Sequence, residues 1–481
     1  MDKIIDFFNY FNDNILQPII MILILGVGIL LTTRTTFMQV RKFGFSCKMT
    51  VGKSLKESFK KDKDKTKKVS PFAAFATAIA GTVGVGNIVG VATALTMGGP
   101  GAIFWMWFSA FFGMVTKYSE TVLGLFFRKK DQNGEYSGGA MYYISKIKNL
   151  KWLAVVFAAF CVLASFGFCL VQSNSISSTL SNSIGKAINA DANIFNLIVG
   201  IIIAIVVALV IMGGIKRISS FASYIVPFMA LLFIMLSLII IGININQIPN
   251  AFKLIFTEAF SFKSIGGGVT GIAIAKAMRY GVARGIFSNE AGLGSSVMAH
   301  ASTEVKEPVE QGLWGIFEVF LDTIIICTLT ALVLMTSGAY GAIDINENVI
   351  TGAAMGLYAF ESNLGVFGVI MFSIILPLFA FTTIVSWSYY GEKAIEYLLG
   401  KKAILPFKIV FILLIVLGSV VELALVWVIA DTFNVLMAIP NLIALVILSG
   451  LVARITKNYF SRKNGIDEEP MLSYYDEENI A

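Results

Sequence analysis

A glycine-rich segment within an apolar stretch carries residue types suited to ligand binding. Residues 77–90 contain Thr77, Gly81, Thr82, Gly84, Gly86 and Asn87. Glycines let a helix backbone leave helical dihedrals at low cost. The freed N–H groups and the start of the next half-helix can hold a carboxylate, while freed carbonyls can hold a cation or an ammonium. The alternative is a small-residue packing face, since Gly86 and Gly90 have the Gly-x-x-x-Gly spacing. The polar Thr82 and Asn87 favour a binding site.

The same argument applies to a second segment, residues 284–296, which is more polar than the first. It contains Phe287, Ser288, Asn289, Glu290, Gly292 and Gly294. An acidic side chain in an apolar span is costly unless it is paired or solvated, so Glu290 is a functional candidate. A structural carboxylate that caps broken-helix N–H groups, or pairs with Arg279 or Arg284, is an equal alternative. Glu290 is therefore not assigned as an ion ligand.

Two further apolar stretches carry polar residues at helical spacing. Phe168, Gln172, Ser175 and Thr179 recur on one helix face. Gln172 can donate and accept hydrogen bonds, which suits an ammonium or a carboxylate. Interhelical hydrogen bonding is an equal alternative for the serine and the threonine.

Later in the chain, Thr382, Thr383 and Ser386 group three hydroxyls just before Trp387. Hydroxyl and carbonyl oxygens are hard donors suited to Na⁺, although such residues also bond to their own helix. Glu318 and Asp322 lie four residues apart on one helix face. They could relay a proton or hydrogen-bond backbone groups of neighbouring helices. The chain has 1 histidine, which excludes a relay of several histidines.

Composition places these segments in a membrane. The chain has 481 residues, of which 57% are hydrophobic and 14% charged, against about 25% charged in a soluble domain. Continuous apolar runs long enough to cross a bilayer recur throughout, which predicts a polytopic α-helical protein rather than a β-barrel. The cysteines lack metal-ligand spacing, so we expect them to be reduced, and no cofactor beyond a coupling ion is expected. No nucleotide-binding loop is indicated, because residue 47, five before Gly52-Lys53-Ser54, is a cysteine.

The apolar runs predict eleven spans, at residues 15–31, 71–95, 102–127, 152–184, 194–212, 221–241, 268–302, 311–335, 365–399, 404–428 and 433–455. If the first is set aside, the glycine-broken helices come first in each group of five, which is the layout of an inverted repeat. The expected organisation is an N-terminal region (1–33), a basic cytoplasmic loop (34–69), two five-helix repeats (70–242 and 268–455) joined by an extracellular connector (243–267), and a cytoplasmic tail (456–481).

Charge sets the expected orientation. The net charge is +7, and its excess is concentrated between residues 34 and 68. A cytoplasmic loop beside anionic lipids explains this run better than a nucleic-acid partner. The other basic segments fall on the same side in this count of spans. We therefore expect a plasma-membrane protein with its N-terminus outside and its C-terminus in the cytoplasm.

A family resemblance rests on several motifs. Residues 98–113, GGPGAIFWMWFSAFFG, resemble the signature of the alanine or glycine:cation symporters. Residues 284–294, 387–393 and 70–72 are similar to the same family. The resemblance implies a LeuT-type inverted-repeat fold with one extra N-terminal helix. It also implies cotransport of small neutral amino acids, alanine and glycine, with Na⁺ or H⁺.

The resemblance also implies residue roles. The first break, Gln172, residues 287–289 and Trp387 would line an amino-acid pocket. Thr382 and Thr383 would face the first broken helix, where that fold holds Na⁺. Many members have Thr where this chain has Val85, and Gln where it has Ala73. Any oxygen supplied by that Thr must come from another group here.

Other classes of function fit the chain less well. A channel would need a continuous polar file, and a membrane hydrolase would need a nucleophile with a base or metal ligands. A transporter-like sensor, which binds an amino acid without moving it, remains an alternative. Saturable binding without accumulation would distinguish that sensor from a symporter.

Overall fold

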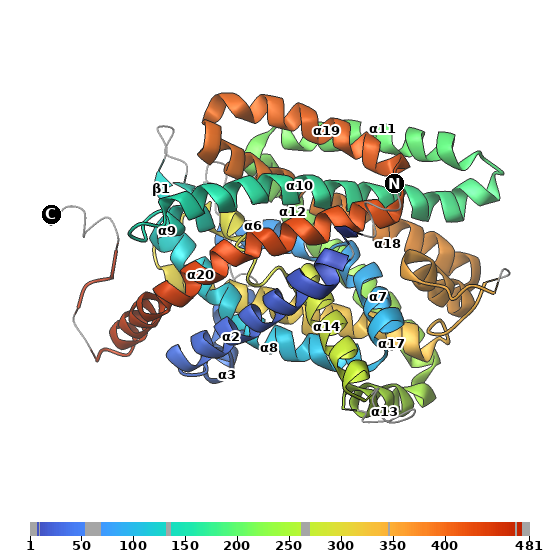
Figure 1. The fold of residues 1–481 in the computed structure, drawn as a ribbon, viewed down its shortest axis with the longest axis horizontal. Helices are drawn as coiled ribbons and strands as arrows, with labels where there is room; N and C mark the ends of the chain where they lie inside the picture. Colours follow the sequence, from blue (N-terminus) through green and yellow to red (C-terminus); the bar gives the residue numbers. More distant parts are fainter. Residues whose placement is uncertain are drawn as a thin grey trace.

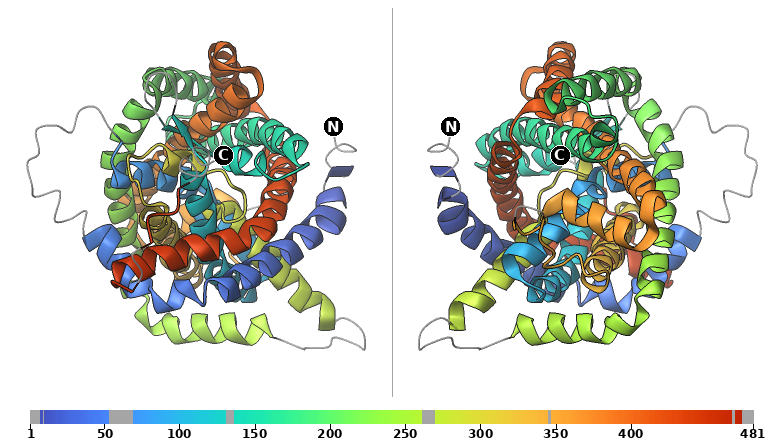
Figure 2. Two further views of the ribbon diagram at one scale, coloured as in Figure 1. Left: turned by 90° about the vertical axis from the view of Figure 1, so that its left-hand side faces the viewer. Right: turned by 90° about the vertical axis from the view of Figure 1, so that its right-hand side faces the viewer.

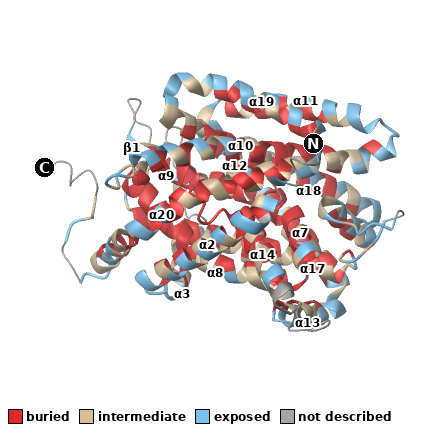
Figure 3. Cartoon of the chain, in the orientation of Figure 1, coloured by how far each residue is buried: buried red, intermediate tan, exposed pale blue. Residues whose placement is uncertain are grey.

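The computed structural model describes residues 7–8, 10–52, 69–130, 136–260, 270–344, 347–466 and 469–473. Long helices dominate it (Figure 1). The hairpin of β1 (Lys129–Lys130) and β2 (Tyr136–Ser137) is the only sheet in this described part. Buried residues gather where the long helices cross, and exposed ones follow the outer faces (Figure 3). Parts of the predicted basic loop, connector and tail, and residues 268–269 of the seventh predicted span, lie outside the described residues.

Eight helices of the described chain are long and apolar enough to cross a membrane. They are α2 (Gln17–Arg34), α10 (Lys151–Leu180), α11 (Ala192–Ile211), α12 (Gly214–Ile243), α16 (Pro308–Val319) continued through η6 (Phe320–Cys327) into α17 (Thr328–Thr336), α18 (Gly352–Leu399), α19 (Ile404–Val420) and α20 (Leu423–Lys463). A bent pair, described next, adds a ninth. The remaining two predicted spans correspond to α8 (Gly101–Phe126) and to α14 (Thr270–Asn289) with α15 (Val297–Ala301). The total of eleven stays a prediction.

The first predicted break is present. Ser70 accepts a hydrogen bond from Ala73 N–H and caps α6 (Pro71–Thr82), which begins on a proline. Gly84 is fully extended, and a short 3₁₀ turn, η3 (Val85–Asn87), leads to α7 (Val89–Gly98). The two half-helices are bent by 59°. This chain therefore interrupts a span where the glycines predicted it.

The second predicted break is also present. α14 ends at Asn289, and Glu290 has φ +55°. Gly292 and Gly294 have φ +95° and +73°, the left-handed region that glycine adopts without steric cost. The short α15 resumes at Val297. The polar run of the sequence is thus an irregular linker between two helical pieces.

The long helices enclose these breaks. α10 packs against α18, α19 and α20, while α8 packs against α14 and α16. The first broken span meets the second because α7 contacts α14. Helix α2 lies beside α8 and α20 at the edge of the bundle (Figure 2). The short helices of the fold include α3 (Met38–Arg41), α4 (Phe43–Cys47), α9 (Ala140–Ile144) and α13 (Ile248–Ala259), and α13 lies in the segment predicted as the connector.

One predicted boundary is wrong. The turn between the last two helices lies at Val421 and Glu422, not at residues 429–432. The predicted spans leave Asp431 and Thr432 between helices, yet both residues lie inside α20 and bond to other elements. The end of α19 is fixed from α10, where Asn174 Nδ2 donates to the Val421 carbonyl at 2.7 Å. The predicted start of the ninth span at residue 365 coincides with a break, because Gly365 is non-helical (φ +60°) within α18, and a further helical piece from Gly352 precedes it.

Candidate functional site

The side chains of Asn87 and Gln172 accept hydrogen bonds from the backbone of the first break. Gly84 N–H donates to Asn87 Oδ1 at 2.8 Å, and Val85 N–H donates to Gln172 Oε1 at 3.3 Å. A Cβ on Gly84 would lie 2.3 Å from Thr383 Oγ1 and 3.4 Å from Gln172 Oε1. Only glycine therefore lets α6, α10 and α18 approach so closely here.

Asp322 joins the two breaks. Asn87 Nδ2 donates to Asp322 Oδ1 at 2.7 Å, and Ser288 Oγ donates to Oδ2 at 2.8 Å. Thr323 Oγ1 donates to the same Oδ2 at 2.8 Å. All four side chains are buried. The sequence suggested a proton relay or backbone contacts for Asp322, whereas its carboxylate is held by side chains from both broken spans.

Three aromatic rings stack beside the first break. The Phe168 ring centroid lies 3.8 Å from that of Trp387 and 4.7 Å from that of Phe287. A Cβ on Gly86 would lie 3.2 Å from Phe287 Cδ1. The structure therefore gathers the predicted pocket residues Phe168, Gln172, Phe287 and Trp387 around Gly84 and Gly86.

Two of the predicted ion-site hydroxyls face α6. Thr383 Oγ1 donates to the Ala80 carbonyl at 3.2 Å, and Ser386 Oγ donates to the Thr77 carbonyl at 2.9 Å. Gly81 lies against Ser386, since a Cβ there would be 3.3 Å from Ser386 Cβ. These oxygens line the contact between α6 and α18.

Thr382 and Thr82 point elsewhere. Thr382 Oγ1 lies 3.6 Å from Met229 Sδ on α12 and bonds the Phe379 carbonyl of its own helix. The expectation that Thr382 faces the first broken helix is therefore wrong. Thr82 Oγ1 donates to the Ile79 carbonyl within α6.

The remaining predicted residues stabilise the second break. Asn289 Oδ1 accepts from Ala291 N–H at 2.9 Å, and its Nδ2 donates to Thr323 Oγ1 at 3.0 Å. The Gly292 carbonyl accepts from Asn441 Nδ2 at 2.9 Å. Gly292 itself packs against α2 and α20 rather than against the first break. The structure brings Ser288 to the first break and leaves Gly292 on the far side of the linker.

Glu290 bonds to side chains of α18 and of the second break. Its Oε1 accepts from Trp387 Nε1 at 2.8 Å, and its Oε2 accepts from Ser295 Oγ. Arg284 pairs with Asp431 of α20 at 2.8 Å instead. Glu290 thus tethers the second break to the aromatic stack through the Trp387 indole.

A buried charge network was missed by the sequence reasoning. Lys117 Nζ on α8 lies 3.2 Å from Glu318 Oε1, and His300 Nε2 lies 2.7 Å from Glu318 Oε2. Lys117 also donates to Ser296 Oγ at 2.8 Å, next to α15. The lysine, the glutamate and the histidine are 0% exposed. The sequence does contain a signal for this network, because Lys117 is an ionisable residue within an apolar span.

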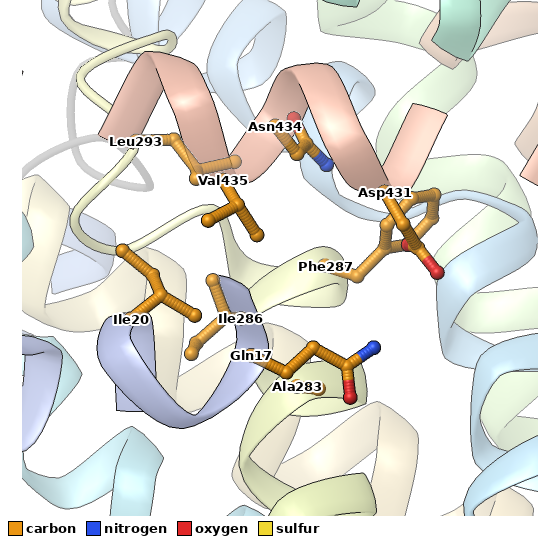
Figure 4. Close-up of a pocket in the computed structure, with 9 residues that line it drawn as sticks. All are labelled: Gln17, Ile20, Ala283, Ile286, Phe287, Leu293, Asp431, Asn434 and Val435. Carbon is orange, nitrogen blue, oxygen red and sulfur yellow. The ribbon is translucent and has the colours of Figure 1, made fainter. Parts of the chain in front are cut away.

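A small pocket lies between α2, α14 and α20 (Figure 4). Gln17, Ile286, Phe287, Asp431 and Asn434 are among its lining residues. It shares Phe287 with the aromatic stack and Asp431 with the Arg284 ion pair. The pocket therefore adjoins the site at the breaks through α14, while α2 and α20 form its other walls.

Two interrupted helices that face each other within a bundle of spans are typical of the LeuT-type membrane fold. A solved structure supports this fold, the crystal structure of MhsT in complex with L-phenylalanine. It matches with a TM-score of 0.57 and 13% identity, covering 82% of this chain and 99% of that one. The architecture predicted from the sequence is confirmed at the level of fold class.

The chain belongs to the sodium:alanine symporter family, whose model matches residues 1–472. It is 43% identical to the sodium/alanine symporter AgcS of Methanococcus maripaludis, over 95% of this chain and 97% of that protein. It is 38% identical to the probable sodium/glutamine symporter GlnT of Bacillus subtilis, over 94% and 90% of the two chains. The protein is thus a multi-pass membrane transporter of the class that couples amino-acid symport to Na⁺, and not an enzyme.

Proposed function

We propose that this protein imports alanine and glycine together with Na⁺ by alternating access. One observation carries the proposal: the two helix breaks converge on Asp322, with Gly84 lying between the α18 hydroxyls and Gln172. A single stretch of backbone therefore adjoins a cluster of oxygens on one side and amide and aromatic groups on the other. The family and the AgcS relative support the choice of ion and amino acid.

The amino acid would bind at the first break. The start of α7 carries a partial positive charge that favours the carboxylate. Gln172 and freed carbonyls would receive the ammonium. The stacked rings of Phe168, Phe287 and Trp387 would restrict the pocket to a small side chain. One relative is named a probable sodium/glutamine symporter. The size of the side chain that this protein accepts should therefore be measured.

The cation would bind between α6 and α18. The Thr77 and Ala80 carbonyls and the hydroxyls of Thr383 and Ser386 are hard oxygen donors on buried residues. Each charge moved across 100 mV contributes about 2.3 kcal/mol. That supports roughly fifty-fold accumulation per Na⁺ from the potential alone, because each 1.36 kcal/mol is about tenfold.

The test is uptake of labelled alanine into proteoliposomes. An inward Na⁺ gradient is compared with equal Na⁺ on both sides and with a proton gradient alone. Accumulation that needs the Na⁺ gradient supports the proposal. Proton-driven accumulation would turn attention to Glu290, Glu318 and Asp322. Saturable binding without accumulation would instead indicate the sensor.

We also propose an outside N-terminus and a cytoplasmic C-terminus. The segments expected in the cytoplasm meet at one end: Arg462 pairs with Glu307 at 2.8 Å, and the Phe45 and Phe460 rings lie 5.7 Å apart. Arg128 donates to the carbonyls of Ala301, Thr303 and Val305 at the same end. A green fluorescent protein fused to the C-terminus should fluoresce in cells, whereas an alkaline phosphatase fusion at that position should be inactive.

A further inference from the structure

Tyr390 on α18 carries a buried hydroxyl that no protein group satisfies. Its side chain is 0% exposed, and its hydroxyl has no hydrogen-bond partner among the residues that the structure describes. An unpaired buried hydroxyl costs about 1–3 kcal/mol. Native proteins satisfy such groups with protein, water or an ion. The hydroxyl therefore calls for a partner from outside the chain.

The hydroxyl lies beside the proposed cation site. A Cβ on Gly81 would lie 2.7 Å from the Tyr390 hydroxyl oxygen and 3.3 Å from Ser386 Cβ. Gly81 directly follows Ala80, whose carbonyl accepts from Thr383. Tyr390 comes four residues after Ser386 and seven after Thr383, so the three share one face of α18. The phenolic oxygen thus lies on the same contact between α6 and α18 as the other oxygens.

We propose that the Tyr390 hydroxyl is a further oxygen ligand of the coupling cation. The inference rests on the proposed Na⁺ site and extends it by one residue. A neutral hydroxyl oxygen suits a hard monovalent cation, and the ion would satisfy the oxygen that the protein leaves unpaired. The proposal also explains why residue 81 is a glycine, because any larger residue would place a carbon against the phenolic oxygen.

The decisive variant is Tyr390→Phe, which keeps the ring and removes only the oxygen. Tyr389→Phe is the matched control, because Tyr389 is also buried but its hydroxyl is not among the unpaired atoms. We expect Tyr390→Phe to raise the half-saturating Na⁺ concentration for alanine uptake about three- to tenfold, as for one lost oxygen contact. Binding of radioactive Na⁺ to the purified protein should weaken by the same factor. The alanine KM at saturating Na⁺ should not change, and Tyr389→Phe should match the wild type.

Unchanged Na⁺ binding in Tyr390→Phe would overturn the inference and leave a structural water as the partner. Thr383→Val and Ser386→Ala, measured in parallel, separate this failure from that of the cation site. If these two weaken Na⁺ binding while Tyr390→Phe does not, only the inference fails. If uptake by the wild-type protein does not depend on Na⁺, both the inference and the proposed function fail. Should Tyr390→Phe not fold, Gly81→Ala is compared with Gly81→Ala/Ser386→Ala, because the methyl group would lie 2.7 Å from the Tyr390 hydroxyl and 3.3 Å from Ser386 Cβ. Weaker Na⁺ binding in Gly81→Ala than in Ser386→Ala supports the inference, and binding equal to that of the wild type would overturn it.

Discussion

Replacing Lys117 by methionine should strongly destabilise the protein. Lys117, Glu318 and His300 are 0% exposed, so the substitution leaves the Glu318 carboxylate buried beside the single histidine. Removing one partner of a buried ion pair costs about 3–5 kcal/mol. Since 1.4 kcal/mol is a factor of ten in an equilibrium constant, the ratio of folded to unfolded protein should fall by about two to four powers of ten. Denaturant unfolding in detergent, followed by size-exclusion chromatography of a fluorescent fusion, measures this.

Two controls separate charge burial from loss of a lysine. Lys393→Met removes a lysine from α18 whose pair with Glu396 is partly exposed, at 16% and 14%, so about 0–1 kcal/mol is expected. The double variant Lys117→Met/Glu318→Gln removes both charges and keeps an acceptor for His300, so it should recover much of the loss. The reasoning is refuted if Lys117→Met loses no more than Lys393→Met, or if the double variant is no more stable than Lys117→Met.

Three further substitutions test the site at the breaks. Gly84→Ala should lower alanine uptake at equal expression, because its Cβ would lie 2.3 Å from Thr383 Oγ1 and overpacking costs about 1–3 kcal/mol. Uptake equal to that of the wild type would contradict this. Asp322→Asn keeps the shape of the side chain but removes the carboxylate that both breaks contact. Uptake should drop about tenfold or more, while size-exclusion profiles stay monodisperse. Retained uptake would exclude a role for the carboxylate. Phe168→Ala removes the central ring of the stack and should admit larger amino acids, measured by competition of glutamine with labelled alanine; unchanged selectivity would show that other residues limit size.

The helix breaks could be predicted because their cause is local. Glycines and polar residues within an apolar stretch determine where a span can be interrupted, and both interruptions lie where the sequence placed them. The boundary between α19 and α20 could not be predicted in the same way. Asp431 and Thr432 resemble turn residues, yet Asp431 pairs with Arg284 and Thr432 bonds Asn12. Those partners are remote in the sequence, so local polarity pointed to the wrong residues.

The same distinction applies to the candidate site. Thr382 and Thr383 are neighbours about 100° apart around a helix, and only the packing of α18 decides which one faces α6. The partners of Glu318 lie on α8 and α15, and no spacing rule connects three helices. Residue types on one face could be predicted, whereas pairings between helices required the tertiary structure.

The geometry of Gly84 offers a physical route for coupling ion and amino acid. Thr383 and Gln172 both lie within contact distance of the position that a Gly84 side chain would occupy. Thr383 bonds the Ala80 carbonyl and Gln172 bonds Val85 N–H, so the two proposed sites hold opposite ends of the same six residues. A cation that held residue 80 in place would thereby restrict the backbone at residue 85. By thermodynamic linkage, whatever factor Na⁺ adds to alanine affinity, alanine must add to Na⁺ affinity.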